Sequence, residues 1–345
     1  MPARANTRSI RHIMNGVNLE KLNILTFATH ERYEETLCKT GHNFYSLRVG
    51  KEWDATYAPV PSNYHIVDEI PAWLDIDLVL SHTSDSRMQV AHDILSGSRG
   101  LQGQLACPIL RHTHVLPDVR FNVDEQVQNF QSIPVDHNSF ISDYNRDQWG
   151  CDASSSSVIS HGIDVEHWTK LDATEGSRRQ PVCLSVVNEF PTRDWCCGFN
   201  LWQDIAQSVP CKVVGKCTGQ YEGFSQPAKN KDDLRQSYKK AAIFLNTSLH
   251  SPVPTALMEA MACGCPVVST ETCMIPEIIE HGVNGFMSND PMELKEYCKQ
   301  LLNDEELSRT MGYAAQKTIA SRFGINKFAE NWNNLFYKVI GDFKL

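Results

Sequence analysis

Short apolar runs of four to six residues recur along the chain, and each is followed by a polar turn and then by a segment with helical spacing. Continuous apolar runs are typical of strands that are buried on both faces of a parallel sheet. The segments between them have the length and period of crossover helices. The pattern therefore predicts repeated βα units and an α/β fold.

The rhythm occurs twice. In the first half, strands are predicted at residues 22–28, 43–49, 77–82, 108–114, 138–143 and 157–162, with helices at 30–39, 84–96, 121–131 and 143–149. In the second half, strands are predicted at 181–187, 211–215, 241–247 and 266–270, with helices near 197–208, 232–240 and 255–263. The chain from Pro291 onward has helical spacing throughout.

Residues 171–180 separate the two halves and are polar and unpatterned, which is typical of a link between domains. Two doubly wound, Rossmann-like domains in tandem are the economical interpretation. We predict a first domain over residues 1–166, a linker over 167–180, a second domain over 181–325 and a C-terminal helix over 326–345.

Composition fits this organisation. A chain of 345 residues, 41% hydrophobic and 21% charged, is long enough for two globular domains. The formal net charge is −9, and acidic side chains outnumber basic ones in the first half. No block of like charge is present, so no nucleic-acid partner is expected. No apolar stretch approaches the roughly 20 residues of a membrane span, so no integral membrane association is expected.

The twelve cysteines have no framework spacing and form no C-x-x-C motif, although Cys196 adjoins Cys197. Thiols in a reducing compartment are the favoured interpretation, which indicates a cytoplasmic protein. The first 16 residues are rich in Arg and poor in acids, and they lack the apolar core of a secretory signal. We expect a loose tail there.

Residues 251–271 are the most informative stretch. Pro252 and Pro254 cannot lie inside a helix, but proline suits a first turn, so a helix is expected to begin near Pro254 or Thr255. Gly264 ends this helix before the next strand. The helix start presents unpaired backbone N–H groups and the positive end of the helix dipole. In an open α/β sheet, that end faces the ligand crevice and suits a phosphate.

Glu259 is the lone acid of this helix. It lies four residues beyond Thr255, on the same face and roughly 6 Å further along the axis. That offset suits a molecule with a phosphate at the helix start and a ribose diol at the carboxylate, as in a nucleoside diphosphate. The alternative is that Thr255 is only an N-cap and that Glu259 points to solvent.

The run from Thr255 to Met287 resembles the nucleotide-sugar signature of retaining GT-B glycosyltransferases, in particular glycosyltransferase family 4, the glycosyl transferases group 1. Residues 158–168, 182–198 and 212–219 resemble further segments of that family. The resemblance covers about residues 22–340 and is specific only in the second half. It implies a GT-B fold, in which two Rossmann-like domains face each other across a cleft and the C-terminal helix crosses back to the first domain.

The resemblance also implies a donor site. Glu259 matches the second carboxylate of the family's Glu-x7-Glu pair, which binds the donor ribose, whereas Ser251 stands where the first carboxylate is expected. This departure puts donor identity and part of the rate in doubt. The family's Gly-Phe-Gly is replaced by Pro252-Val253-Pro254, yet the backbone N–H groups of Thr255 and Ala256 still suit a diphosphate.

A basic pair normally grips the diphosphate in this family. Asn188 and Arg193 have its spacing here, so Arg193 is expected to be the remaining cation and to stabilise the leaving group. Lys216 and Lys229 are weaker candidates for contacts to the base or phosphate. A solvated surface side chain is the plain alternative for all three.

Candidates on the acceptor side lie at predicted strand ends. His82 is similar in position to the family histidine near the reacting carbon, and His114 to a neighbouring crevice residue, with His112 in support. Thr29 and His30 replace the family's glycine-rich first turn and are expected to contact donor phosphate or acceptor. A core histidine is the alternative for each imidazole.

Three other readings are weighed. A metal-dependent transferase needs Asp-x-Asp after a strand, but Asp75-Ile76-Asp77 precedes its strand, so neither metal nor cofactor is expected. Ser251 and Asn188 are compatible with a degenerate module that binds nucleotide sugars without turnover. A transferase for modified DNA conflicts with the acidic first half. The favoured prediction is a retaining, metal-independent glycosyltransferase that moves a sugar from a nucleoside-diphosphate sugar to a hydroxyl of a neutral glycan or small molecule.

Overall fold

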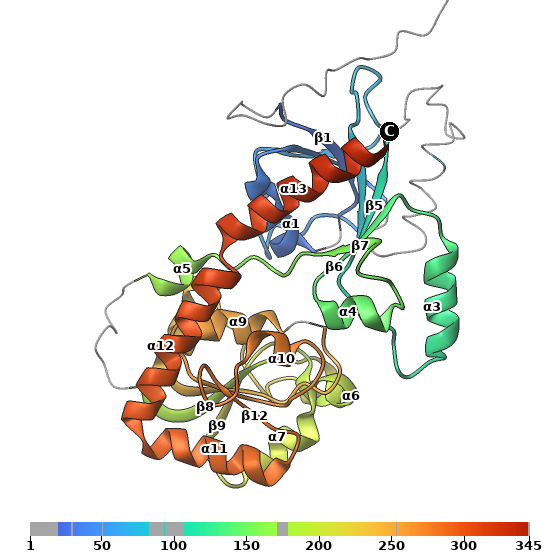
Figure 1. Cartoon of the computed structure of the whole chain (residues 1–345). Coiled ribbons are helices and arrows are strands. Elements are labelled where there is room, and N and C mark those ends of the chain that lie inside the picture. The colour runs from blue at the N-terminus through green and yellow to red at the C-terminus, as the bar shows by residue number, and fades with distance from the viewer. Residues whose placement is uncertain are drawn as a thin grey trace, which may run out of the picture. The chain divides into compact units, whose positions relative to one another are not determined.

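A computed structural model describes residues 20–343, except 29, 50, 83–92, 94–106, 171–178 and 253. The chain forms two compact units (Figure 1). Unit 1 contains residues 1–112, 132–139 and 329–345, and unit 2 contains residues 113–131 and 140–328. Each unit is therefore built from separate stretches of the chain. Among the described residues, no helix is long and apolar enough to cross a membrane.

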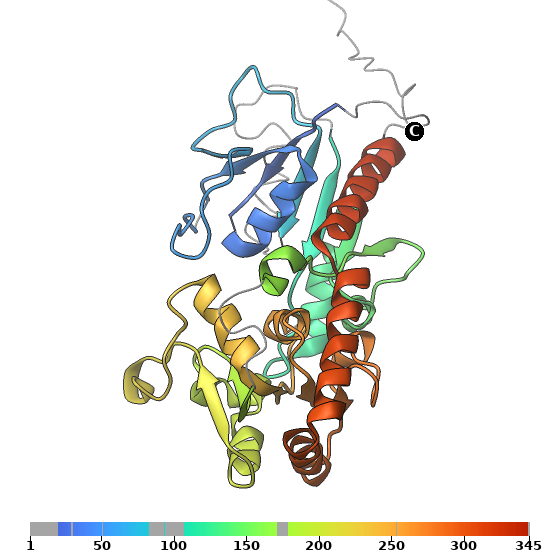
Figure 2. The same ribbon diagram turned by 90° about the vertical axis from the view of Figure 1, so that its left-hand side faces the viewer.

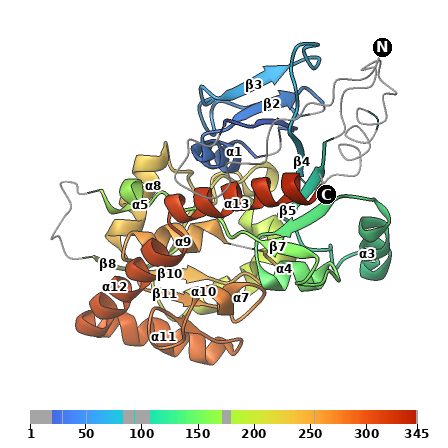
Figure 3. The ribbon, with the colours of Figure 1, turned by 45° about the horizontal axis from the view of Figure 1, so that its top comes forward.

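The first sheet is formed by the strands of the first half. Seven described strands pair in the order β3-β2-β1-β4-β5-β6-β7. Their bounds are β1 Asn23–Thr26, β2 Asn43–Leu47, β3 Tyr64–Val67, β4 Leu78–His82, β5 Ile109–Thr113, β6 His137–Phe140 and β7 Ser156–Val158. The pairs of β1 with β2 and β4, of β2 with β3, and of β4 with β5 are parallel. Figure 3 shows β2 and β3 side by side at the edge of the sheet.

Helices connect or follow these strands. They are α1 Glu31–Leu37 with the 3₁₀ turn η1 Cys38–Thr40, α3 Val123–Ser132, α4 Asp143–Gln148 and α5 Val165–Thr169. All six predicted strands are confirmed within a few residues, as are the helices predicted at 30–39, 121–131 and 143–149. The helix predicted at 84–96 lies almost wholly outside the described residues. The sequence pattern missed β3 because it is an edge strand with two exposed central residues, His65 and Ile66.

The second sheet has five described strands in the order β12-β11-β10-β8-β9, all parallel. Their bounds are β8 Gln180–Val186, β9 Cys211–Val214, β10 Ala241–Asn246, β11 Val267–Ser269 and β12 Phe286–Met287. Each of the six residues of β10 is buried. Burial on both faces explains why this strand has an unbroken apolar run rather than an alternating pattern.

The helices and turns that surround the second sheet follow the predicted rhythm. They are η2 Phe190–Arg193, α6 Asp194–Cys197, α7 Phe199–Ala206, η3 Gly219–Tyr221, α8 Lys231–Lys240, α9 Thr255–Ala262, α10 Ile275–Ile278, α11 Pro291–Asn303 and α12 Glu305–Arg322. One apolar core joins the sheet to α8, α9 and α12, and a second joins it to α7 and α11. Figure 1 accordingly shows α9 on one side of the sheet and α7 and α11 on the other, so unit 2 has three layers.

The last helix, α13 Ile325–Phe343, belongs to both units, since unit 1 takes residues from Ala329 onward. In unit 1, the buried Trp332 ring meets His112 edge-on at 4.7 Å between ring centroids. Asn333 Nδ2 donates a hydrogen bond to the carbonyl oxygen of Thr40 (3.3 Å). Figure 2 shows α13 in red beside the strands of unit 1. The C-terminal residues therefore complete the core of the unit that the N-terminal residues begin.

Candidate functional site

The order of the strands makes the carboxyl ends of β8 and β10 in unit 2 a candidate ligand site. The chain runs from β8 to β9 on one side and then crosses to β10 on the other side of β8. The segments that follow β8 and β10 therefore turn away from each other, and a crevice opens between the carboxyl ends of these strands. The β8 loop, residues 187–198, and the β10 loop, residues 247–254, border this switch point.

Backbone contacts hold these two loops together. The N–H groups of Leu249 and His250 both donate to the carbonyl oxygen of Cys196, at 2.9 and 3.1 Å. Thr247 Oγ1 donates to the carbonyl oxygen of Cys197 (2.9 Å). Gly198 has φ +69° and lies so close to Thr247 that an added Cβ would be 2.0 Å from the carbonyl oxygen of Thr247. Only glycine satisfies both the left-handed backbone and this close approach.

Helix α9 begins at the end of the β10 loop, at Thr255, as predicted. Pro254 is the N-cap residue, and no side chain caps the helix start. Thr255 is exposed and Ala256 is half-buried, whereas Leu257 and Met258 are fully buried in the core. The first N–H groups of α9 thus lie at the surface of a helix that the core holds in place. Such a helix start attracts an anion.

Glu259 lies one turn further along α9 and is half-buried, so it does not point into bulk solvent. The hydroxyl of Tyr238, from α8, donates a hydrogen bond to Glu259 Oε2 (3.0 Å). Tyr238 is fully buried and packs edge-on against Trp168, at 5.7 Å between ring centroids. The phenol therefore fixes the direction of the carboxylate. Sequence reasoning missed Tyr238 because an aromatic residue on the apolar face of a helix predicts only a core position.

Arg193 ends η2 in the β8 loop and is exposed. Its Nη1 donates a long hydrogen bond of 3.5 Å to the carbonyl oxygen of Asn188. Neighbouring groups lower the pKa of the Cys196 thiol: a hydrogen bond with the Cys197 thiol has the larger effect, and the positive charge of Arg193 has a smaller one. Arg193 and the start of α9 therefore belong to the pair of loops that Cys196 and Thr247 join.

Asn188 replaces the basic residue that the family resemblance predicts, and it has a structural use. Its Oδ1 accepts a hydrogen bond from the backbone N–H of Lys216 in the β9 loop, residues 215–218 (2.9 Å). The neighbouring Glu189 has a left-handed backbone (φ +53°), donates its N–H to the Lys216 carbonyl oxygen (2.7 Å), and accepts from Thr218 N–H through Oε2 (3.1 Å). These bonds join the β8 and β9 loops.

The remaining candidates of unit 2 are less tightly placed. Lys216 and Lys229 are exposed, and within the described part of the chain neither ammonium group forms an ion pair. The backbone N–H of Lys229 donates to Asp233 Oδ2 just before α8 (2.9 Å). Ser251 is half-buried in the β10 loop and offers a hydroxyl where a carboxylate was expected.

The candidate histidines divide between the units. In unit 1, His82 is buried at the end of β4, and its ring lies 6.0 Å from the ring of His112. His112 Nε2 is hydrogen-bonded to the Tyr33 hydroxyl (2.9 Å), and Nδ1 to Ser139 Oγ (2.8 Å). Both imidazoles therefore belong to a packed polar network inside unit 1. His114, which follows β5 and belongs to unit 2, stacks on His161 at 5.9 Å between ring centroids.

The first turn of unit 1 is partly described. Thr29 lies outside the described residues. His30 is the N-cap of α1, where its Nδ1 accepts a hydrogen bond from Tyr33 N–H (3.4 Å). Burial and, after it, the charge of Lys51 lower the pKa of His30. His30 therefore serves as the capping group of α1.

The acidic motif Asp75-Ile76-Asp77 precedes β4, as expected. Asp77 Oδ2 accepts a hydrogen bond from the backbone N–H of Asn23 at the start of β1 (2.8 Å). In the described ranges, no group of three or more His, Cys, Asp or Glu side chains is arranged to hold a metal ion.

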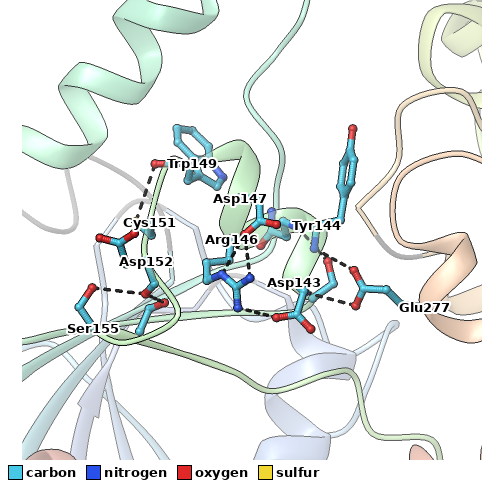
Figure 4. Close-up of polar contacts among 12 residues, drawn as sticks. Asp143, Tyr144, Arg146, Asp147, Trp149, Cys151, Asp152, Ser155 and Glu277 are labelled. Carbon is cyan, nitrogen blue, oxygen red and sulfur yellow. Dashed lines mark hydrogen bonds and ion pairs between the residues drawn. The ribbon is translucent and has the colours of Figure 1, made fainter.

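Glu277, in α10, is half-buried and forms a contact that sequence reasoning did not identify. Figure 4 shows its carboxylate accepting the first two N–H groups of α4, from Tyr144 (2.8 Å) and Asp143 (3.2 Å). Burial is the main cause of its raised pKa. Glu277 thus ties α4 to α10 within unit 2. The carboxylate of Glu277 thus occupies the start of α4, whereas no side chain caps the start of α9.

Comparison with known proteins agrees with this geometry. Residues 224–318 match the family model of glycosyl transferases group 1, a range that contains Lys229, Tyr238 and all of α9. N-acetyl-alpha-D-glucosaminyl L-malate synthase of Bacillus anthracis is 32% identical over 116 residues, which are 33% of this chain and 30% of that protein. The amylovoran biosynthesis glycosyltransferase AmsK of Erwinia amylovora is 44% identical over 66 residues, 17% of this chain and 16% of that protein. This chain thus aligns with a third or less of either relative.

Solved structures match over nearly the whole chain. Sucrose-phosphate synthase of Thermosynechococcus elongatus has a TM-score of 0.71 and 14% identity, over 93% of this chain and 100% of that chain. HepE of Anabaena, in complex with UDP-glucose, has a TM-score of 0.70 and 16% identity, over 92% of this chain and 100% of that chain. The predicted GT-B fold and the predicted resemblance to glycosyl transferases group 1 are confirmed.

Proposed function

We propose, from the group 1 glycosyltransferase match across α8, α9 and the segments around them, that this protein transfers a sugar from a nucleoside-diphosphate sugar to a hydroxyl group of an acceptor. The observation that carries the proposal is the open start of α9 with a half-buried carboxylate one turn along the same helix. A phosphate and a ribose of one ligand match these two features.

The donor diphosphate binds at the N–H groups of Thr255 and Ala256, where the helix dipole favours negative charge. Glu259 accepts hydrogen bonds from the ribose hydroxyls, and Tyr238 orients this carboxylate. Arg193 offers its guanidinium to the leaving diphosphate. Lys216, Lys229 and Ser251 border the same strand ends and add weaker contacts to donor base, phosphate or sugar.

In the transfer step, the bond between the anomeric carbon and the diphosphate oxygen breaks, and the electron pair leaves with the diphosphate. The acceptor hydroxyl forms the new glycosidic bond, and its proton passes to the departing phosphate oxygen. Charge on the diphosphate grows as the bond breaks, so donors fixed before the reaction stabilise the transition state more than the bound substrate. We propose retention of the anomeric configuration, in line with the resemblance to family 4.

The same groups support transfer without a metal ion, because the start of α9 and Arg193 supply positive charge where a metal would. His114, which is half-buried, is a proposed contact for the donor sugar or the acceptor hydroxyl. The burial of His82 inside unit 1 fits the alternative of a core histidine better than the contact expected from the resemblance. HepE, which shares the fold, has been crystallised with UDP and with UDP-glucose, so we propose a UDP-sugar as the first donor to test. The acceptor is proposed to be a glycan or a small molecule.

The test measures release of nucleoside diphosphate from a panel of UDP-, GDP- and ADP-sugars, with and without a library of hydroxylated acceptors and with EDTA present. Acceptor-stimulated release that persists in EDTA is the expected result. The absence of both nucleotide-sugar binding and release would contradict the proposal.

A second candidate function is a binding module without turnover, which the hydroxyl of Ser251 in place of a carboxylate favours. It predicts tight binding of one nucleotide sugar and no acceptor-stimulated release across the panel. The variant Ser251→Glu introduces the carboxylate that the family resemblance predicts at this position, and it further separates the active transferase from the binding module. In a degenerate module, this change is expected to raise release above background.

A further inference from the structure

Unit 1 contains a cavity that has no part in donor binding. It has a volume of about 110 Å³ and lies at the carboxyl ends of β1 and β2. Its lining residues are Ala28, Ser46, Leu47, Arg48, Lys51, Glu52, Trp53 and Ile66. The carboxyl ends of parallel strands are where α/β sheets bind ligands. A cavity needs about 10–15 Å³ of such volume to hold one water molecule, so there is room here for a small charged group such as a carboxylate or a phosphate.

Lys51 supplies a cation that is fixed in place. Its Nζ lies 2.8 Å from the carboxylate of Glu31, which is buried at the start of α1. The same carboxylate accepts a hydrogen bond from the backbone N–H of Asp54 (3.1 Å). The buried acid therefore anchors both the lysine and the turn that carries it, so the ammonium group is in position before a ligand arrives.

Arg48 supplies a second cation, and its present partners are easily exchanged. Its Nη1 lies 3.6 Å from Glu52, and its Nε lies 3.2 Å from Asp68. The side chains of these acids are 75% and 81% exposed, so both pairs contribute little to stability. An acidic ligand group with bidentate geometry is a stronger partner for a guanidinium than a solvated side chain at 3.6 Å.

Trp53 supplies an apolar wall. Its indole N–H donates to the carbonyl oxygen of Ala58 (2.8 Å), and its ring lies 4.6 Å from the ring of Tyr64. The N–H is thus already engaged and the ring is held in place, so Trp53 offers a ligand contact area, to which the C–H groups of a sugar or polyol can pack.

We propose that this cavity anchors an acidic group, carboxylate or phosphate, of a hydroxylated acceptor, through Arg48 and Lys51 beside the Trp53 ring. This inference rests on the proposed function in one respect only, namely that the bound acid is the acceptor of the transferred sugar. It departs from the neutral acceptor expected from the acidic first half of the sequence, because two basic side chains, Arg48 and Lys51, line this cavity and only one acidic side chain, Glu52, does so among its described lining residues.

The experiment titrates the whole protein with glucuronate, glucose 6-phosphate and inorganic phosphate, and with glucose as the uncharged probe, by isothermal titration calorimetry. We expect the acids to bind and glucose to bind at least about tenfold more weakly, since a charge-assisted pair is lost. Glucuronate against glucose 6-phosphate shows which acid the cavity prefers. Equal affinity for glucose and both acids would overturn the proposal, as would no binding of any acid.

Variants with opposite expected signs assign binding to the cavity. Arg48→Gln is expected to weaken acid binding about tenfold, whereas Glu52→Gln is expected to strengthen it, because Glu52 competes for Arg48. Lys39→Gln, at an exposed position of η1 outside the cavity, is the matched control and leaves affinity unchanged. Acid binding that is unaffected by both Arg48→Gln and Glu52→Gln would refute the assignment.

UDP affinity of the same variants separates this inference from the proposed function. We expect Arg48→Gln to retain wild-type affinity for UDP, which also shows that the variant is folded. If UDP fails to bind while acids still depend on Arg48, the proposed donor site is wrong and the cavity assignment stands. If UDP binds and the acids do not, the cavity assignment is wrong and the proposed donor site stands.

Discussion

Glu259 gives the most direct test of the donor site. Replacing it by alanine removes a carboxylate that we propose accepts hydrogen bonds from the donor ribose. Hydrogen bonds to a charged group contribute about 1.5–3 kcal/mol, which corresponds to roughly 12- to 150-fold in Kd. The Glu259→Ala variant is therefore expected to bind UDP at least about tenfold more weakly than the wild type.

The structure predicts a second effect of the same change. Tyr238 is fully buried and donates to Glu259 Oε2, so Glu259→Ala leaves its hydroxyl without this acceptor. A buried polar group that loses its partner costs about 1–3 kcal/mol of folding free energy. Glu259→Gln keeps an acceptor oxygen for Tyr238 and removes only the charge. It is expected to preserve stability and to lose about half of the binding energy that alanine loses, because charged hydrogen bonds are about twice as strong.

Two titrations and one denaturation series check this reasoning. Calorimetry with UDP and with pyrophosphate separates the ribose contact from the phosphate contact, since pyrophosphate has no ribose. We expect Glu259→Ala to weaken UDP binding and to leave pyrophosphate binding unchanged or slightly tighter, because a nearby negative charge is removed. Urea denaturation compares the free energies of unfolding. Equal losses for UDP and pyrophosphate, or an unchanged Kd for UDP, would refute the ribose assignment.

Three further predictions concern other parts of the chain. Arg193→Ala is expected to lower kcat more than it raises the donor KM, because charge develops on the diphosphate in the transition state. Arg193→Lys is expected to have a kcat between those of the wild type and of Arg193→Ala. Steady-state kinetics test this prediction, and an effect on KM alone would contradict it. Gly198→Ala is expected to lower the free energy of unfolding by more than about 2 kcal/mol, since φ is +69° and the added Cβ would meet a backbone oxygen. Gly219→Ala is the control: φ is +62° but no atom lies within 4 Å of the added Cβ, so a loss of about 1–2 kcal/mol is expected. Equal losses of stability in urea denaturation would argue against the close approach at Gly198. Burial lowers the pKa of His42 to about 4, and its Nδ1 accepts a hydrogen bond from Leu22 N–H, so below about pH 6.5 the unfolded chain binds a proton that the folded chain does not bind. Roughly 3 kcal/mol of the free energy of unfolding is therefore lost as the pH falls from 6.5 to 4. His42→Gln should flatten this pH dependence of stability, and an unchanged pH profile would exclude His42 as its source.

The sequence predicted the fold well where burial alone decides the pattern. The fully buried β10 and the helix that begins after Pro254 were both identified, because a continuous apolar run and a proline at a helix start have few alternative explanations. The edge strand β3 was missed since His65 interrupts its short apolar run and only Tyr64 of its four residues is buried. Edge strands have weaker patterns for this physical reason.

The candidate site was only partly predictable. A helix start and its lone acid can be identified from spacing, so the start of α9 at Thr255 was predicted, while the donor contacts of Thr255 and Glu259 stay predictions. The contacts of Tyr238 and Asn188 depend on which helix or loop lies opposite, and this information is absent from local spacing. Asn188 illustrates the difference. The sequence shows only that position 188 lacks the basic residue that the family resemblance predicts, whereas the structure shows that Asn188 joins the β8 loop to the β9 loop by a hydrogen bond.

The path of the chain through unit 1 affects how the protein is made. Trp332 and Phe336 fill a core whose other walls come from residues near the start of the chain, such as His42 and His112. A ribosome releases those early residues long before it has made α13. The first β-strands must therefore wait, incompletely covered, through the synthesis of more than 200 further residues, while unit 2 closes its own sheet. Chaperone dependence during translation is expected to be concentrated in this interval.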